Sequence, residues 1–203
     1  MSADSSKPKI LSVRTAARSK LFEIESVRLQ FKNGLETEFE RVSSTPIYGA
    51  VVVVPMLDLA TFLLVKEYAV GFDRYEVGLP KGLVHVNEPL LAAANRELME
   101  ETGYTAKRLS KLYTLTVAAG FLCYATDVVL ALDLENSGPK QGDEPEPPEV
   151  IQWPVSALDE LITSNYVTDA RSVAALYLAR SVIQSKEFHE PDIALPDCVN
   201  GLP

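Results

Sequence analysis

A continuous apolar run in the first half of the chain constrains the fold more than any other feature. It extends from Ala50 to Leu57 (AVVVVPML) and is rich in valine. A strand with one solvated face alternates apolar and polar residues, so an unbroken apolar run is typical of a strand that is buried on both faces. Asp58 to Ala60 separates this run from a second one, Thr61 to Lys66. Together the two runs predict the centre of a β-sheet.

Two further runs near the N-terminus predict a β-hairpin. Phe22 to Phe31 alternates apolar and polar residues with one phase shift, and Asn33-Gly34 separates it from Leu35 to Val42. An Asn-Gly pair between two such runs is a strong signal for a hairpin turn. Because a two-stranded unit is marginally stable alone, we expect this appendage, residues 1–45, to pack on another structure. A partner subunit is one candidate.

The remaining patterns predict a main domain over residues 46–188 and an irregular tail over residues 189–203. Glu135 to Pro148 is rich in Pro, Gly and acidic residues, which predicts a surface loop. Further strands and helices are expected from periodicity. The strands are Leu112–Val117, Asp127–Leu134 and Glu149–Trp153, and the helices are Val155–Ile162 and Asp169–Gln184.

One predicted helix, Pro89 to Glu101, carries a concentration of acidic residues, and Gly103 is placed to end it. Glu97, Glu100 and Glu101 stand at positions i, i+3 and i+4, so their carboxylates share one face. Like charges at that spacing are destabilising unless a cation neutralises them. Mg²⁺ is such a cation, because it prefers the oxygen ligands that carboxylates and pyrophosphate supply.

The alternative for these glutamates is a solvated acidic face that Arg96 and neighbouring bases balance. The whole chain has a formal net charge of -9 and a pI of about 4.8. It therefore has no diffuse positive field with which to hold nucleic acid. An acidic protein that acts on phosphates needs localised cations, and bound metal supplies them.

Cysteine content and hydropathy bear on cofactors and compartment. Cys123 and Cys198 are the only cysteines, too few for a four-Cys zinc site or a disulfide framework. No apolar run approaches the roughly 18 residues that a membrane span needs, and residues 1–9 lack the apolar stretch of a secretory signal. We expect a cytoplasmic protein without zinc that binds neither membrane nor nucleic acid.

The acidic helix lies within a longer pattern, Gly82-x₅-Glu88-x₇-Arg96-Glu97-Leu98-Met99-Glu100-Glu101-Thr102-Gly103-Tyr104. The seven fixed Gly, Glu and Arg positions would coincide by chance on the order of once in 10⁸ starting points. The pattern resembles the Nudix box. From about Ile10 to Gln184 the chain is similar to the Nudix hydrolase family, especially its ADP-ribose pyrophosphatase-like members, through segments such as Lys66–Gly71 (KEYAVG) and Trp153-Pro154.

This resemblance implies an α/β/α sandwich with a mixed sheet, and hydrolysis that depends on Mg²⁺, with Mn²⁺ as a substitute. It also implies which residues bind metal or take part in catalysis. They are the backbone carbonyl of Lys81, Arg96, Glu97, Glu100, Glu101 and, in the acidic loop, Glu144 as general base and Glu146 as auxiliary ligand. The alternative for the loop is a Pro-stiffened acidic surface without a catalytic role.

Other residues of the box have supporting roles in this resemblance. Gly82 would let the backbone approach the metal and the phosphate closely, where a side chain would obstruct them. Glu88 would pair with Arg96 and hold the loop in shape. Gly103 would end the helix.

The resemblance further implies a substrate and a quaternary structure. ADP-ribose, NADH or diadenosine polyphosphates would be hydrolysed to AMP and a second product, by a homodimer whose N-terminal hairpin packs against the partner. Phe22 would stack on adenine and Arg41 would meet a phosphate; the alternatives are core packing for Phe22 and an ion pair with Glu40 for Arg41. Ala69 and Ala119 stand where the broader relatives carry an arginine and a proline, so one cationic contact and one specificity marker are absent.

Two other functions are compatible with the box. Other nucleoside di- or triphosphates, or capped RNA ends, would undergo the same chemistry, although no basic stretch is available to grip an RNA backbone. A nucleotide-sensing module would bind without turnover, although such modules usually lose the glutamates that are intact here. His85 and His189 have no assigned role.

Overall fold

The computed structural model describes residues 7–44, 49–138 and 145–185. Its main sheet runs in the order β10-β5-β4-β9-β8, with β6 paired to β5 and β7 paired to β4. The strands are β4 (Ala50–Asp58), β5 (Thr61–Ala69), β6 (Arg74–Gly78), β7 (Lys81–Leu83), β8 (Tyr104–Thr116), β9 (Ala125–Asn136) and β10 (Glu149–Pro154). The helices are α1 (Leu90–Thr102), the short 3₁₀ helix η1 (Val155–Ala157), α2 (Leu158–Thr163) and α3 (Ala170–Gln184).

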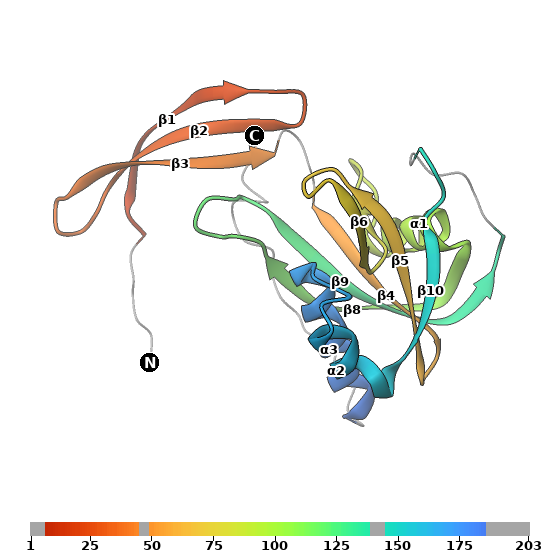
Figure 1. The fold of residues 1–203 in the computed structure, drawn as a ribbon. Coiled ribbons are helices and arrows are strands. Elements are labelled where there is room, and N and C mark those ends of the chain that lie inside the picture. Colours follow the sequence, from red (N-terminus) through yellow and green to blue (C-terminus); the bar gives the residue numbers. More distant parts are fainter. Residues whose placement is uncertain (1–6, 45–48, 139–144, 186–203) are drawn as a thin grey trace.

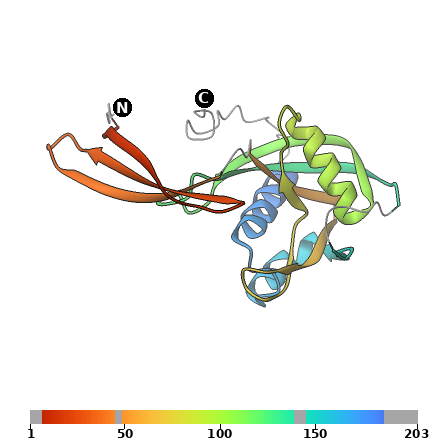
Figure 2. The ribbon, with the colours of Figure 1, turned by 90° about the horizontal axis from the view of Figure 1, so that it is seen from above.

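The main sheet lies between two layers of helix, as Figures 1 and 2 show. On one face α1 packs onto Val51 and Val53 of β4. On the other face α2 and α3 cover a core that includes Val52 and Val54. Alternate residues of β4 therefore belong to two different cores, and every residue from Ala50 to Met56 is buried. This confirms the predicted strand with two buried faces and the α/β/α sandwich.

Strand β4 changes its neighbour along its length, and this places the site. It is parallel to β9 and antiparallel to its other partners, so the sheet is mixed. The first residues of β4 pair with β7, in the register Val51↔Gly82, whereas its end pairs with β5 at Met56↔Phe62. Strand β7 thus lies beside the start of β4 and in contact with α1.

The N-terminal part forms a separate antiparallel sheet in the order β1-β2-β3. Strands β2 (Phe22–Gln30) and β3 (Glu36–Ser44) confirm the predicted hairpin. The expectation of a two-stranded appendage was incomplete, because β1 (Lys9–Arg18) adds a third strand whose residues are all exposed. Its pairing with β2 contains two register shifts, which hide the alternation that would have revealed it. Backbone hydrogen bonds from Val42 to Phe121 (2.8 Å) and from Cys123 to Val42 (3.0 Å) join β3 to the main domain.

The other sequence expectations differ from the structure mainly at their boundaries. Strands β8 and β9 are longer than predicted, and β9 continues through Asn136 into the segment expected to be loop. Val155–Ile162 divides into η1 and α2. Residues 139–144 and the tail from residue 186 lie outside the described residues. Among the described residues, no helix is long and apolar enough to span a membrane.

Candidate active site

Helix α1 brings its acidic residues against the sheet. Pro89 precedes its first turn, and Gly103 ends it in the left-handed conformation (φ 75°), with its N–H donating to the carbonyl oxygen of Met99. Ala93, Ala94 and Leu98 on the apolar side of α1 are completely buried against β4 and β9. Glu97 and Glu101 flank that side and are themselves buried, with 7% and 3% of their surface exposed. Two acidic residues are thus held inside the fold, where an isolated charge is costly.

Strand β7 lies against this acidic side of α1. The backbone N–H of Lys81 donates a hydrogen bond to Glu101 Oε1 (3.2 Å). At the next residue, a Cβ atom added to Gly82 would overlap the carboxyl group of Glu97. The absent side chain of Gly82 therefore leaves the space that the Glu97 carboxylate occupies, which is a close approach only glycine permits.

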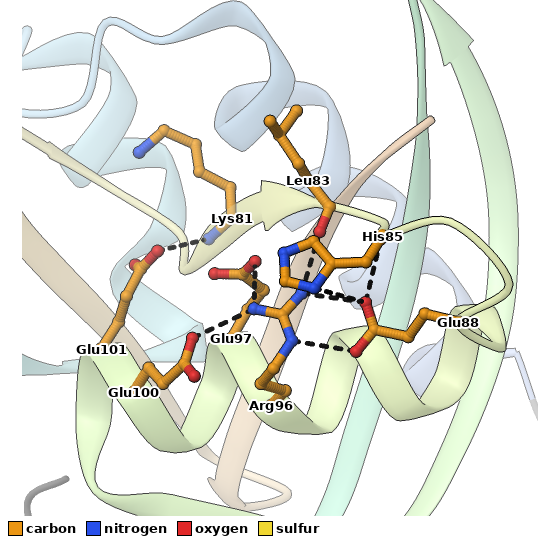
Figure 3. Close-up of polar contacts among 8 residues, drawn as sticks. All are labelled: Lys81, Leu83, His85, Glu88, Arg96, Glu97, Glu100 and Glu101. Carbon is orange, nitrogen blue, oxygen red and sulfur yellow. Dashed lines mark hydrogen bonds and ion pairs between the residues drawn. The ribbon is translucent and has the colours of Figure 1, made fainter. Parts of the chain in front are cut away.

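Arg96 connects the helix to the loop before it, as Figure 3 shows. Its guanidinium donates to both carboxylate oxygens of Glu88, at 2.9 and 3.0 Å, and to the carbonyl oxygen of Leu83 at 2.9 Å. It also donates to Glu97 (2.8 Å) and Glu100 (3.0 Å). The expected ion pair with Glu88 is present. These hydrogen bonds lower the pKa of Glu88 to about 2 and raise the pKa of Arg96.

Glu101 has the most perturbed carboxyl group of the site. Burial raises its pKa to about 8; the charge of Lys81 opposes that rise, and Glu67 adds to it. Its Oε2 atom is buried and accepts no hydrogen bond. A buried oxygen without a partner is rare in proteins and is the kind of atom that a bound ion satisfies.

The carboxylates of the site do not meet at one point. Among the described residues, no three His, Cys, Asp or Glu side chains are arranged to hold a metal. Arg96 binds Glu97 and Glu100, as the alternative of a balanced acidic face predicts, whereas Glu101 turns to Lys81. Glu97 and Glu101 are nevertheless buried and not solvated. The ligand types of the site, carboxylate oxygens beside the backbone of β7, are those that Mg²⁺ takes, so holding one ion requires these carboxylates to turn toward one another.

Glu67 is a member of the site that its sequence position does not reveal. It lies near the end of β5 and forms an ion pair with the Lys81 side chain. Glu67 is in β5 and Lys81 is in β7, and β6 lies between them in the chain, so no local spacing signals their contact. Its sequence traces are that it follows directly on the apolar run of β5 and that it lies in the Lys66–Gly71 segment that resembles the Nudix relatives, neither of which assigns it to the site.

Residues 139–144 of the acidic loop lie outside the described residues. Glu144, the predicted general base, is one of them. Glu146 accepts a hydrogen bond from the Tyr75 hydroxyl. Both residues line a cavity of about 660 Å³ together with Glu67. The predicted auxiliary ligand Glu146 and the site residue Glu67 therefore face the same space.

The structure does not bring the two predicted substrate contacts near α1. Phe22 and Arg41 belong to β2 and β3 of the N-terminal sheet, which extends from the main domain on the side away from α1 (Figures 1 and 2). Arg41 lies where this sheet meets the main domain, because it lines a cavity with Gly120 and Phe121. Phe22 is 57% exposed, so it is not a core residue of this chain. Arg41 pairs with Glu25 of β2 at 2.7 Å and not with Glu40, the partner in the alternative interpretation, because residues 25 and 41 are cross-strand neighbours. His85 is exposed beside Glu88, and His189 lies outside the described residues.

Comparisons with known proteins agree with this geometry. A model of the NudE-type Nudix hydrolase N-terminal domain matches residues 8–41, and a model of the NUDIX domain matches residues 47–176. ADP compounds hydrolase NudE of Escherichia coli (strain K12) is 40% identical over 92% of this chain and 98% of its own length. ADP-ribose pyrophosphatase of Bacillus subtilis (strain 168) is 31% identical over 83% of this chain and 92% of its own. A crystal structure of an ADP compounds hydrolase superposes with a TM-score of 0.81 at 41% identity, covering 88% of this chain and 95% of that one.

Proposed function

The chain belongs to the NudE-type Nudix hydrolases, and from this membership we propose that it hydrolyses the pyrophosphate bond of ADP-containing nucleotides and releases AMP. ADP-ribose, NADH and diadenosine polyphosphates are the proposed substrates. The observation that carries the proposal is Glu101, a buried carboxylate with an unpartnered oxygen, on a helix that completes the family's box.

We propose that Glu97, Glu100, Glu101 and the backbone carbonyl of Lys81 hold Mg²⁺. When bound, the ion neutralises the diphosphate and lowers the pKa of a water that attacks phosphorus. Mn²⁺ would substitute, since it accepts the same oxygen ligands. The unsatisfied Oε2 of Glu101 supports this assignment.

The chain's own residues orient these carboxylates. Arg96 holds Glu97 and Glu100 by charge-assisted hydrogen bonds, and Glu88 holds Arg96 from the other side. Because Gly82 has no side chain, β7 can lie in close contact with the Glu97 carboxyl group; a Cβ atom there would overlap it. Arg96 is thus proposed to act in catalysis by positioning Glu97 and Glu100, and Gly82 by letting the backbone of β7 approach the Glu97 carboxylate closely, which is where metal and phosphate are proposed to lie.

Glu144 is proposed as the general base and Glu146 as an auxiliary ligand. The position of Glu146 supports the second role, because it lines one cavity with Glu67, whose partner is Lys81. Tyr75 holds Glu146 through its hydroxyl group. Glu144 and Glu146 belong to one loop, so the proposed general base, which would receive the proton of the attacking water, and the proposed auxiliary ligand would come from the same segment.

We further propose a homodimer in which residues 1–45 contact the partner and residues 46–188 form the catalytic domain. The N-terminal sheet exposes several large apolar side chains, which supports an interface there. They are Ile10, Leu11, Val13, Leu21, Phe22, Leu35 and Phe39. Since Phe22 and Arg41 are remote from α1 of their own chain, their proposed substrate contacts require this sheet to lie over the site of a partner. A sizing column with light scattering tests the dimer.

An activity assay with a matched pair of variants tests the proposed function. The full chain is incubated with Mg²⁺ and ADP-ribose, NADH, diadenosine triphosphate or ADP-glucose, and AMP is measured. We expect Glu101→Gln to reduce turnover by roughly 10²- to 10³-fold. Glu36→Gln, an exposed carboxylate on β3, should leave turnover unchanged. Activity retained in Glu101→Gln, or ADP-ribose bound by the wild type without AMP release, would refute the proposal.

A further inference from the structure

The β5–β6 hairpin carries a second cavity that the proposed metal chemistry does not use. This cavity, which we call the hairpin cavity, has a volume of about 320 Å³. The residues that line it include Glu67, Phe72, Arg74, Lys81, Thr168 and Arg171. Lys81 joins the hairpin cavity to the α1 glutamates, because its backbone N–H donates to Glu101. A ligand that occupies the hairpin cavity would therefore lie beside the metal-binding carboxylates.

Phe72 at the tip of the hairpin is an exposed aromatic platform. Its side chain is 76% exposed, so it contributes little to the core. The guanidinium carbon of Arg74 lies 5.6 Å from the centre of the Phe72 ring. Asp73 between them has a positive φ of 54°, which forms the tight turn that places both side chains together. An exposed ring beside a guanidinium is suited to stacking with a flat aromatic ligand.

Hydrogen bonds with Glu76 of the same strand, and with Thr168 from the segment before α3, fix Arg74 in place. Its Nε donates to Glu76 Oε1 at 2.6 Å, and the Thr168 hydroxyl donates to Glu76 Oε2 at 2.7 Å. These bonds, that of Thr168 first, lower the pKa of Glu76. Thr168 in turn precedes α3, whose Ser172 accepts a hydrogen bond from the backbone N–H of Leu79 at 3.0 Å. The hairpin that carries Phe72 and Arg74 is therefore held against the start of α3 by hydrogen bonds to Thr168 and Ser172.

The charges of the hairpin cavity are balanced among themselves. Each of its three cations has a carboxylate partner: Lys81 with Glu67, Arg74 with Glu76, and Arg171 with Asp169. Free cations would favour a bare phosphate, whereas paired ones favour an uncharged group with a polar edge. A nucleobase is uncharged at neutral pH, flat, and rich in donors and acceptors. It matches both the platform and the charge balance.

We propose that the hairpin cavity binds a nucleobase of the substrate, stacked on Phe72 beside Arg74, while the diphosphate lies at the α1 glutamates. The inference rests on the proposed hydrolysis of ADP compounds and adds a specificity-determining residue to it. The base is either the adenine that all these substrates share, in which case Phe72 takes the stacking role proposed for Phe22, or the second base of a dinucleotide, in which case the adenine stays with Phe22. Either base would stack on Phe72 in the same way, and the set of substrates whose KM rises in Phe72→Ala distinguishes the two.

The kinetic test compares Phe72→Ala with Phe72→Tyr and with Leu59→Ala, which truncates another exposed apolar residue, at the β4–β5 turn. Loss of one stacked base should raise KM about 5- to 10-fold. A rise for ADP-ribose, NADH and diadenosine triphosphate alike assigns the cavity to adenine. A rise for NADH and diadenosine triphosphate alone assigns it to the second base. Phe72→Tyr should restore KM and Leu59→Ala should not change it. An unchanged KM for every substrate in Phe72→Ala would overturn the proposal.

A binding test keeps this inference separate from the proposed activity. AMP and ribose 5-phosphate are titrated into the full chain in the presence of EDTA, so that neither metal nor turnover contributes. The wild type should bind AMP at least fivefold more tightly, and Phe72→Ala should abolish that preference. Such a result would uphold the hairpin cavity even if no substrate were hydrolysed. An AMP preference that survives in Phe72→Ala excludes adenine from the hairpin cavity, and together with an unchanged KM for NADH and diadenosine triphosphate it would contradict the proposal.

Discussion

The α1–β7 region and the N-terminal sheet use the same pair of residue types, arginine and glutamate, to different effect. In the α1–β7 region, Arg96 has only 23% of its side chain exposed and binds Glu88, Glu97 and Glu100 together. In the N-terminal sheet, Arg28 pairs with Glu36 across β2 and β3, and their side chains are 57% and 38% exposed. Water screens the second pair and not the first. Burial therefore decides whether an arginine–glutamate pair contributes little to the structure or fixes the position of functional groups.

The largest effect should follow from removing the partly buried cation Arg96. Arg96→Met deletes the charge that compensates three carboxylates while it keeps the length of the side chain. We expect a loss of about 2–4 kcal/mol in the free energy of unfolding and a fall in turnover of roughly 10²-fold, because Glu97 and Glu100 lose their fixed positions. Urea denaturation and AMP release measure the two quantities. Unaltered stability and turnover would show that the Arg96 network is no more important than a surface pair.

A smaller change tests the close approach of β7 to α1. Gly82→Ala adds one methyl group where the Glu97 carboxyl group lies. Because Glu97 is the flexible end of a side chain, it can shift without unfolding the protein, so we expect turnover to fall roughly 10-fold with the thermal midpoint lowered by only a few degrees. Gly71→Ala, where an added Cβ meets nothing within 4 Å, is the matched control. Equal activity in the two variants would remove Gly82 from the site.

Acid should affect the α1–β7 region through Glu88. Its pKa is about 2 in the folded protein against 4.5 as the ordinary value, so its ion pair stabilises the fold above about pH 4.5. That stabilisation is lost as the pH falls through about 2. Glu88→Gln should be less stable than the wild type by about 1–3 kcal/mol at pH 7, and the difference should shrink progressively below pH 4.5. Chemical denaturation across this pH range measures it, and a difference independent of pH would contradict the assignment.

The smallest effect is expected in the N-terminal sheet. Arg28→Met removes the cation of an exposed cross-strand pair. We expect a change of at most about 0.5 kcal/mol in the free energy of unfolding and none in turnover by the isolated chain. A loss as large as that of Arg96→Met would erase the difference between the two regions.

The sequence predicted those parts of the fold in which local pattern and burial coincide. The run from Ala50 to Leu57 is unbroken because each face of β4 meets its own core, and the box spacing placed the acidic face of α1 correctly. Strands β6 and β7 were not predicted, because five and three residues are too few to show a period. Contacts made across the hairpin, such as that of Glu67 with Lys81, have no local signal. The alternative for Arg41, an ion pair with its sequence neighbour Glu40, was wrong in its partner, because the register of β2 and β3 selects Glu25.

The central claim is that the glutamates of α1 hold a divalent ion, and Mn²⁺ binding followed by electron paramagnetic resonance tests it most directly. The wild type and Glu36→Gln should bind Mn²⁺ with the same affinity. Glu101→Gln, which replaces the buried carboxylate by a neutral amide of the same shape, should weaken that binding at least tenfold while the fold is retained by circular dichroism. Equal Mn²⁺ affinity in Glu101→Gln and Glu36→Gln would contradict the account.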